Sequence, residues 1–289
     1  MREFYITADD GLELSVAEFE KENPKAIIQV IHGAMEHKER YYHFCKFLND
    51  NGYAVFVSDN RGHGHSVNDK YFLGNFDSSM KIVEDQYIIT KYIKSVYPGK
   101  DLYMFGHSYG SMLARLYLQD HDDEIKKLVL TGTMFPMHVA ELGKAITKLN
   151  SRAFGGNTRK GPVPAIANSG TDIWVCADAD TMKAYRSDPL VQNCKYTNDA
   201  VGCLVEADAL MKKVRNYKAK NPQLPILTAN GKNDVCRGTF IGLTGSIKLL
   251  NKAGYHRVFA ITYPGMRHEV INETDKTAVY DDILRFYNS

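Results

Sequence analysis

The feature that most constrains the fold is a series of short apolar runs, each ending at a glycine or a polar residue. They lie at residues 26–33, 53–59, 101–106, 126–132, 224–231 and 257–265. Apolar runs without alternation are typical of parallel strands that are buried on both faces of a sheet. Segments with the apolar spacing of amphipathic helices lie between or after them, at 78–98, 239–254 and 273–288. This order predicts an α/β fold with a mostly parallel twisted sheet and helices on both faces.

Two segments depart from this alternation. Residues 2–20 alternate apolar and polar side chains around Asp10-Gly11, which predicts a β-hairpin. Residues 134–206 contain no comparable apolar run, but they include helix-like pieces at 140–150 and 178–186 and a loop-like stretch at 155–164. We interpret 134–206 as a helical cap, or lid, inserted into a core formed by residues 1–133 and 207–289.

Composition limits which partners and which cellular compartment are expected for the protein. The 289 residues are 44% apolar and 24% charged, as in ordinary globular proteins, and the net charge of +2 gives no reason to expect a nucleic-acid partner. No signal peptide and no apolar stretch long enough to span a bilayer is visible, so stable membrane insertion is not expected. The five scattered cysteines predict reduced thiols in the cytoplasm, and their spacing predicts no zinc site. The sequence leaves the oligomeric state unknown.

The segment "YMFGHSYGSM" (103–112) places Ser108 between Gly106 and Gly110, where a strand-like run meets a helix-like one. A sharp strand-to-helix turn needs small residues on both sides and holds the serine hydroxyl clear of the sheet, at a helix N-terminus. A plain glycine-rich turn is the alternative interpretation. The strand before and the amphipathic helix after the motif favour a nucleophile elbow, with Ser108 as the nucleophile.

A nucleophilic serine needs a base and an acid that orients the base. Asp234 follows the apolar run at 224–231, and His268 follows the run at 257–265. The chain order serine, aspartate, histidine is that of the α/β-hydrolases, and the carboxyl ends of parallel strands meet at one edge of the sheet. His256 precedes its strand and is therefore expected at the opposite edge.

Two further loops follow strands. The segment "HGAMEH" (32–37) predicts the Ala34 amide as one donor of an oxyanion hole, with Met35 next to it, and the Tyr109 amide as the other donor. His63 and His65 lie two residues apart in the loop "SDNRGHGHSV" (58–67), a spacing that makes a poor metal site, so we favour a rigid hydrogen-bonded turn over metal binding.

These segments resemble a known family. "HGAMEHKERY", "DNRGHGHS", "GHSYGS", "GKNDVC", "MRHEVINE" and the cap segment "TDIWVCADADTMKAYRSDPL" are similar to those of monoacylglycerol lipases and bacterial lysophospholipase-like hydrolases of the α/β-hydrolase superfamily. The resemblance runs from residue 26 to the end, and it implies the same triad and oxyanion-hole residues. Met35 stands where the family commonly has glycine, and Tyr109 and Ser111 stand where it commonly has methionine and glycine.

The sequence therefore predicts a serine esterase that works through an acyl-enzyme on a small-molecule ester, with no cofactor and no metal. The cap residues Phe135, Met137, Ile166, Trp174 and Tyr185, with Met35 from the core, either line an acyl pocket or pack the cap onto the sheet. An aminopeptidase-like amide hydrolase is one alternative and would use Asp172, Asp178 or Asp180 to hold a free amine. A non-catalytic ligand-binding protein on the same scaffold is the other, although such chains usually lack a member of the triad.

Overall fold

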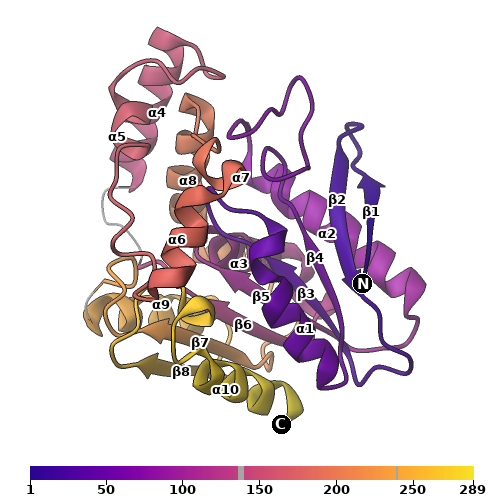
Figure 1. Ribbon diagram of the computed structural model, residues 1–289. Helices are drawn as coiled ribbons and strands as arrows, with labels where there is room; N and C mark the ends of the chain where they lie inside the picture. The colour runs from indigo at the N-terminus through magenta and orange to yellow at the C-terminus, as the bar shows by residue number, and fades with distance from the viewer. Residues whose placement is uncertain (136–139, 239) are drawn as a thin grey trace.

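The chain, in a computed structural model that describes residues 1–135, 140–238 and 240–289, forms one eight-stranded sheet with the strand order β1-β2-β4-β3-β5-β6-β7-β8 (Figure 1). The strands are β1 (Arg2–Thr7), β2 (Glu13–Phe19), β3 (Ile27–Ile31), β4 (Ala54–Ser58), β5 (Leu102–His107), β6 (Lys127–Thr131), β7 (Ile226–Gly231) and β8 (Val258–Tyr263). The predicted runs all form strands, and β3 to β8 pair in parallel. The predicted fold class is confirmed.

The helices around this sheet are α1 (Tyr42–Asp50), α2 (Ser79–Val96), α3 (Tyr109–His121), α9 (Phe240–Lys252) and α10 (Lys276–Asn288). Short 3-10 turns lie at η1 (Lys38–Tyr41), η2 (Asp122–Glu124), η3 (Val214–Asn216) and η4 (Val270–Asn272). Ser78 accepts a hydrogen bond from the Lys81 amide and so begins α2, in the way that N-cap serines do.

Both faces of the sheet are covered, which explains why its strands read as unbroken apolar runs. In β3, Ile27 and Ile31 belong to a hydrophobic cluster with residues of α2 and α3. Ile28 and Val30 point to the opposite face and belong to a second cluster, with residues of α1 and α10. Successive side chains of a strand point to opposite faces of the sheet. Because both faces are covered here, nearly every position of the strand favours an apolar side chain.

The N-terminal hairpin is confirmed, and it extends the sheet at one edge. β1 and β2 pair antiparallel with Ile6 opposite Leu14, and the Ala8 amide donates to the Leu12 carbonyl across the turn at 2.8 Å. β2 also pairs antiparallel with β4.

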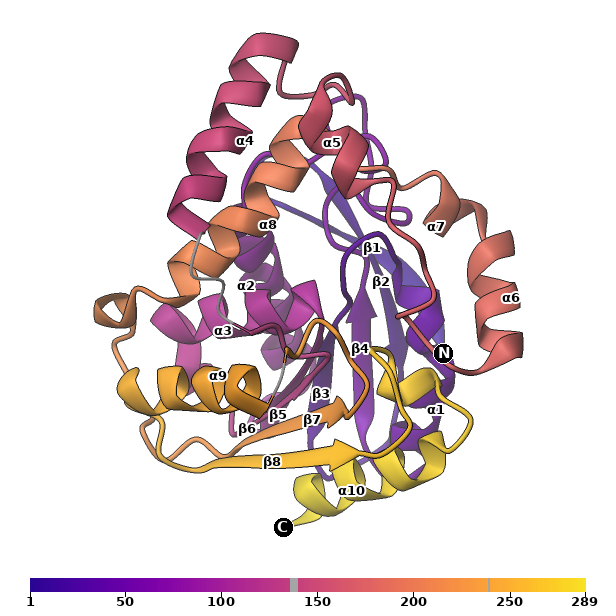
Figure 2. The ribbon, with the colours of Figure 1, turned by 90° about the vertical axis from the view of Figure 1, so that its left-hand side faces the viewer.

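The described part of the segment between β6 and β7 carries five α-helices. They are α4 (Ala140–Phe154), α5 (Pro162–Ala167), α6 (Ala179–Ser187), α7 (Pro189–Gln192) and α8 (Asn198–Met211). Helices α4, α5 and α8 pack together at the end of the molecule away from the C-terminus, and α6 and α7 lie to one side of them (Figures 1 and 2). Two helices overlap the predicted pieces at 140–150 and 178–186. The stretch predicted as loop-like instead begins α5 at Pro162, because proline is well tolerated in the first turn of a helix.

The predicted end of the cap at residue 206 falls inside α8, which continues to Met211. The division into cap and core therefore stays a proposal. Met137 lies outside the described residues. Within the described part of the chain, no helix has both the length and the apolar character that crossing a membrane requires.

Candidate active site

Ser108 lies at the junction of β5 and α3. Its backbone has φ 52° and ψ −118°, an unusual conformation for a residue other than glycine. A Cβ at Gly106 would approach the Gly110 carbonyl oxygen to 2.5 Å, and one at Gly110 would approach the Ile31 carbonyl oxygen to 2.2 Å. Both positions therefore require glycine because backbone crosses there, as expected for a nucleophile elbow.

Asp234 and His268 lie side by side at the carboxyl edge. The His268 Nδ1 is 3.0 Å from both carboxylate oxygens of Asp234, and both side chains are almost fully buried. Burial by itself lowers the pKa of His268, but the hydrogen bond and charge of Asp234, together with nearby Cys236, raise it above its ordinary value. The pairing engages Nδ1 and leaves Nε2 as the candidate base.

The His268 Nε2 has no hydrogen-bond partner among the described residues, and in particular none on Ser108. The imidazole lies against the Trp174 ring, with centroids 5.0 Å apart, and against His107, with centroids 4.9 Å apart. A hydrogen bond between a serine and its base is often loose before substrate binds, so this geometry keeps Ser108 as the candidate nucleophile.

The loop after β3 runs beside Ser108. A Cβ at Gly33 would lie 3.0 Å from the Ser108 Cβ, so glycine lets the two segments approach. The Gly33 amide donates to Glu36 at 2.5 Å and the Met35 amide donates to the Tyr196 hydroxyl at 3.0 Å. With Met35 occupied, Ala34 is the candidate oxyanion donor of this loop.

Tyr109 supplies the other candidate donor, since it is the first residue of α3 and first-turn amides have no acceptor within their helix. Its side chain turns away into the interior. The Tyr109 hydroxyl is 2.8 Å from the Ser79 hydroxyl, and Ser79 donates to the Cys203 carbonyl of α8. The tyrosine at this position therefore anchors the elbow to α2 and to the cap.

An ion-pair network that the sequence did not reveal joins the loop of Ala34 to the loop that carries His268, which we call the histidine loop. Arg40 makes two hydrogen bonds of 2.6–2.7 Å to the Glu269 carboxylate and one of 2.7 Å to Glu36. Burial raises the pKa of Glu36, whereas the charge and hydrogen bonds of Arg40 overcome burial and lower the pKa of Glu269 to about 2. The only signal in the sequence was that these charges flank the motifs of Ala34 and His268.

A second missed contact joins the cap to the histidine loop. The Glu269 amide donates to the Val175 carbonyl at 2.8 Å. The buried carboxylate of Glu273 accepts hydrogen bonds from the amides of Ala177 at 3.0 Å and Arg267 at 2.7 Å. We refer to cap residues 173–177 as the cap strap. The strap fixes the backbone on both sides of His268.

The proposed substrate-binding residues are placed differently from one another. Trp174 contacts the His268 ring, and Met35 is half-buried near Ser108 with φ 56°. Phe135 packs beside the loop of Asp234, where its amide donates to the Cys236 carbonyl at 3.1 Å. Tyr185 packs in a cap cluster and lies under the Arg40 guanidinium at 4.8 Å. Trp174 is therefore the member of this set in contact with the candidate base.

The loop with His63 and His65 is a hydrogen-bonded turn. His63 is buried, and its two ring nitrogens are 2.6 Å from the Tyr196 hydroxyl and 3.1 Å from the Arg61 carbonyl. Burial and the neighbouring His32 lower its pKa to about 3. His65 is exposed and lies 3.4 Å from Glu39. The two imidazoles do not form a joint metal site.

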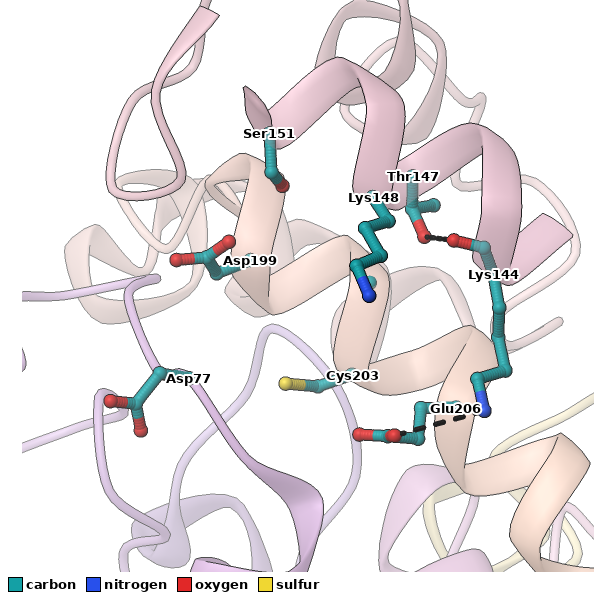
Figure 3. Close-up of a pocket in the computed structure, with 9 residues that line it drawn as sticks. Asp77, Lys144, Thr147, Lys148, Ser151, Asp199, Cys203 and Glu206 are labelled. Carbon is teal, nitrogen blue, oxygen red and sulfur yellow. Dashed lines mark hydrogen bonds and ion pairs between the residues drawn. The ribbon is translucent and has the colours of Figure 1, made fainter. Parts of the chain in front are cut away.

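A separate cavity of about 320 Å³ lies between α4, α8 and the segment before α2 (Figure 3). Asp77, Asp199, Glu206, Lys148 and Cys203 are among the side chains that line it. Burial and the charges of Glu206 and Asp199 raise the pKa of the Cys203 thiol. The raised pKa disfavours the thiolate, so Cys203 lacks the features of an activated nucleophile.

The chain is similar to known proteins of one family. Residues 22–275 match the family described as "Serine aminopeptidase, S33". A monoacylglycerol lipase of Mycolicibacterium smegmatis is 26% identical over 263 residues, which cover 90% of this chain and 87% of that protein. A monoglyceride lipase homolog of monkeypox virus is 27% identical over 253 residues, 88% of this chain and 85% of that protein. The crystal structure of a carboxyl esterase from Bacillus coagulans has a TM-score of 0.86 at 24% identity and covers 99% of this chain and 97% of its own.

Proposed function

The chain belongs to the family described as "Serine aminopeptidase, S33", and from this premise we propose how this carboxylic ester hydrolase cleaves its substrates. We propose that Ser108, His268 and Asp234 form a catalytic triad, that Ala34 and Tyr109 form the oxyanion hole, and that the substrates are monoacylglycerols or similar esters of one acyl chain. The buried pair of Asp234 and His268 beside the strained Ser108 turn is the observation that carries the proposal.

In the proposed reaction, His268 Nε2 takes the proton of Ser108 as the hydroxyl oxygen attacks the ester carbonyl. The amides of Ala34 and Tyr109 hold the negative oxygen of the tetrahedral intermediate. His268 then gives its proton to the departing alcohol, which leaves an acyl-enzyme. Water repeats the cycle with the acyl-enzyme, and Asp234 keeps the imidazole oriented and stabilises its cationic form.

Ester hydrolysis is favoured over removal of an N-terminal residue because two of the three cap acids have partners and the third is exposed on a helix surface. Asp172 forms a two-hydrogen-bond ion pair with Arg186 at 2.7 and 2.9 Å. Asp178 accepts from the Thr181 amide as the N-cap of α6 and from Thr274. Asp180 is exposed on α6. An aminopeptidase needs a free carboxylate facing the site to bind the substrate amine.

Two observations support monoacylglycerols as the substrate class. Two relatives that align over most of the chain are named as lipases of these esters or as homologs of such lipases. In addition, Leu142, Ile146 and Leu149 are 51–68% exposed on one face of α4. An apolar face of this kind suits transient contact with an aggregated amphiphile.

The nucleophile is tested with a fluorophosphonate probe and p-nitrophenyl butyrate. The wild-type protein should be labelled once, and Ser108→Ala should lose the label and lower kcat by about 10⁶-fold. Ser95→Ala, at an exposed serine on α2, is the matched control and should behave as wild type. Continued labelling of the Ser108→Ala protein would remove Ser108 from the mechanism.

The substrate class is tested with monoglycerides of increasing acyl length, with p-nitrophenyl esters and with an aminoacyl-anilide. We expect kcat/KM to be highest for monoglycerides and lowest for the anilide. The double variant Leu142→Ser/Leu149→Ser should lose activity on aggregated monoglyceride and keep activity on soluble p-nitrophenyl butyrate. A preference for the anilide would instead support a peptidase.

We also propose that the protein works in the cytoplasm. All five cysteines are free, which is the usual state in a reducing compartment. Fractionation of cells that express the tagged full-length protein tests this.

A further inference from the structure

Cys236 occupies a special place among the cysteines. The thiols of Cys45, Cys176, Cys194 and Cys203 are buried, whereas Cys236 is half-buried. Its amide donates to Asp234 at 2.8 Å and its carbonyl accepts from the Phe135 amide at 3.1 Å. The backbone of Cys236 is therefore fixed on both sides, which holds its side chain beside the candidate triad.

Three different donor atoms meet at this point. One carboxylate oxygen of Asp234, the Cys236 Sγ and one ring nitrogen of His268 all lie within 4.8 Å of one another. Around a tetrahedral Zn²⁺, a sulfur ligand at about 2.3 Å and a nitrogen ligand at about 2.0 Å are about 3.5 Å apart. Small side-chain rotations would therefore bring the three donors onto one ion. A set of sulfur, nitrogen and oxygen donors selects Zn²⁺ over Mg²⁺ or Ca²⁺, which prefer oxygen alone.

We propose that Asp234, Cys236 and His268 form an inhibitory site for Zn²⁺ or another thiophilic divalent cation. The ion is an inhibitor and takes no part in the ester hydrolysis. The binding site stands on its own geometry, whereas its inhibitory effect rests on the proposed role of His268 as the base.

The chemistry of inhibition follows from the ring nitrogens. In the neutral form of His268 that acts as a base, the contact of Nδ1 with Asp234 favours the tautomer with the proton on Nδ1 and the free electron pair on Nε2. When the ion takes the Nδ1 electron pair, the ring proton moves to Nε2, the Cys236 thiol releases its proton to solvent, and Asp234 exchanges its hydrogen bond for a metal bond. Nε2 then carries a proton and cannot accept one from Ser108. Water fills the fourth metal position.

The first experiment measures binding without turnover. Ser108→Ala protein is dialysed against EDTA and titrated with Zn²⁺ by calorimetry, and with Co²⁺ by absorption spectroscopy. We expect one ion per chain and a thiolate-to-Co²⁺ charge-transfer band in the near ultraviolet. The Cys236→Ser/Ser108→Ala protein should lose this band and bind Zn²⁺ at least about tenfold more weakly. A spectrum without a thiolate band would overturn the site.

The second experiment measures inhibition of p-nitrophenyl butyrate hydrolysis, with each protein compared to its own rate in EDTA. Zn²⁺ should inhibit the wild-type protein reversibly. The inhibition constant of Cys236→Ser should be at least about tenfold higher, and that of the matched control Cys45→Ala, in the interior of α1, should be unchanged. Equal inhibition of Cys236→Ser and wild type would refute the proposal. Failure of the proposed mechanism is seen separately, as activity or labelling that survives in Ser108→Ala.

Discussion

Two of the four non-glycine residues with positive φ in the described part of the chain, Ser108 and Met35, lie in the candidate site. Such a conformation costs on the order of 1–3 kcal/mol and persists only where the surroundings enforce it. At Ser108 the enforcing contacts are the hydrogen bond from its amide to the Thr131 carbonyl, at 2.9 Å, and the close approach of the Ile31 backbone to Gly110. At Met35 the enforcing contact is the hydrogen bond from its amide to the Tyr196 hydroxyl. Strain is therefore located where the proposed nucleophile and oxyanion donors are held.

The raised pKa of His268 gives a prediction for the pH profile. A general base must be neutral, so kcat/KM should fall as the pH drops through the His268 pKa, at a pH above the ordinary imidazole value of about 6.5. In Asp234→Asn, burial still lowers the pKa but the carboxylate no longer raises it. The acid limb should move to lower pH, and kcat should fall by about 10⁴-fold. An acid limb that stays in place would show that Asp234 does not set this pKa.

Arg40 is the single cation shared by two buried carboxylates, and its removal should destabilise the fold. Arg40→Met leaves Glu36 and Glu269 without their cation and should lower the free energy of unfolding by about 3–5 kcal/mol. Denaturant titration measures this. Arg285→Met, which breaks an exposed pair with Asp282, is the control and should cost less than about 1 kcal/mol. Similar losses in both variants would contradict the assignment.

At the scale of elements, the cap strap is bonded to the histidine loop on both sides of His268. The Arg267 guanidinium donates to the carbonyls of Ile173 and Cys176 at 2.5 and 3.0 Å, and the Glu273 carboxylate holds the Ala177 amide. These side chains thereby tie the main chain of the strap to the loop that carries His268.

Glu273→Gln should loosen the strap. The neutral side chain accepts more weakly from the two amides, so the backbone amides of residues 173–177 should exchange hydrogen faster. Misplacement of His268 should lower kcat by about 10- to 100-fold, with a smaller change in KM. Hydrogen exchange and steady-state kinetics test this together. Glu141→Gln, on the exposed surface of α4, is the control. If both variants exchange alike, Glu273 has no positioning role.

The sequence predicts elements well where one local pattern decides the structure. The strands follow from apolar runs, and the Ser108 turn from two glycines. The helices α5 and α7 are short and begin at prolines, so no spacing of apolar residues identifies them. The contacts of Arg40 with Glu269 and of Glu273 with Ala177 join residues 229 and 96 positions apart. Such pairings form only in the completed fold. The sequence alone therefore predicts roles for residues in recognisable motifs, and it does not predict these long-range contacts.

At the scale of the molecule, the cap and the sheet share one hydrophobic cluster. Ala200, Val201 and Cys203 of α8, which lie within the proposed cap, belong to the same cluster as Leu128 of β6 and Ile226 of β7. Because α8 buries its apolar side chains with those of the core, the cap does not have a core of its own at this point.

This shared cluster predicts that the cap and the sheet unfold together. Calorimetry should show one transition, with equal calorimetric and van't Hoff enthalpies. Met211→Ala, at a fully buried position of α8, should cost about 2–5 kcal/mol and move that single transition to lower temperature. Two resolved transitions in either protein would show that the cap is an independent unit.

Trp174 is the only tryptophan of the chain, and its indole rests on the imidazole of His268. A protonated imidazole quenches indole emission more strongly than a neutral one does. The intrinsic fluorescence of the unmodified protein should therefore report the charge on His268, so that protonation of this ring, the proposed zinc binding and the proposed acylation of Ser108 can each be followed by emission without a label.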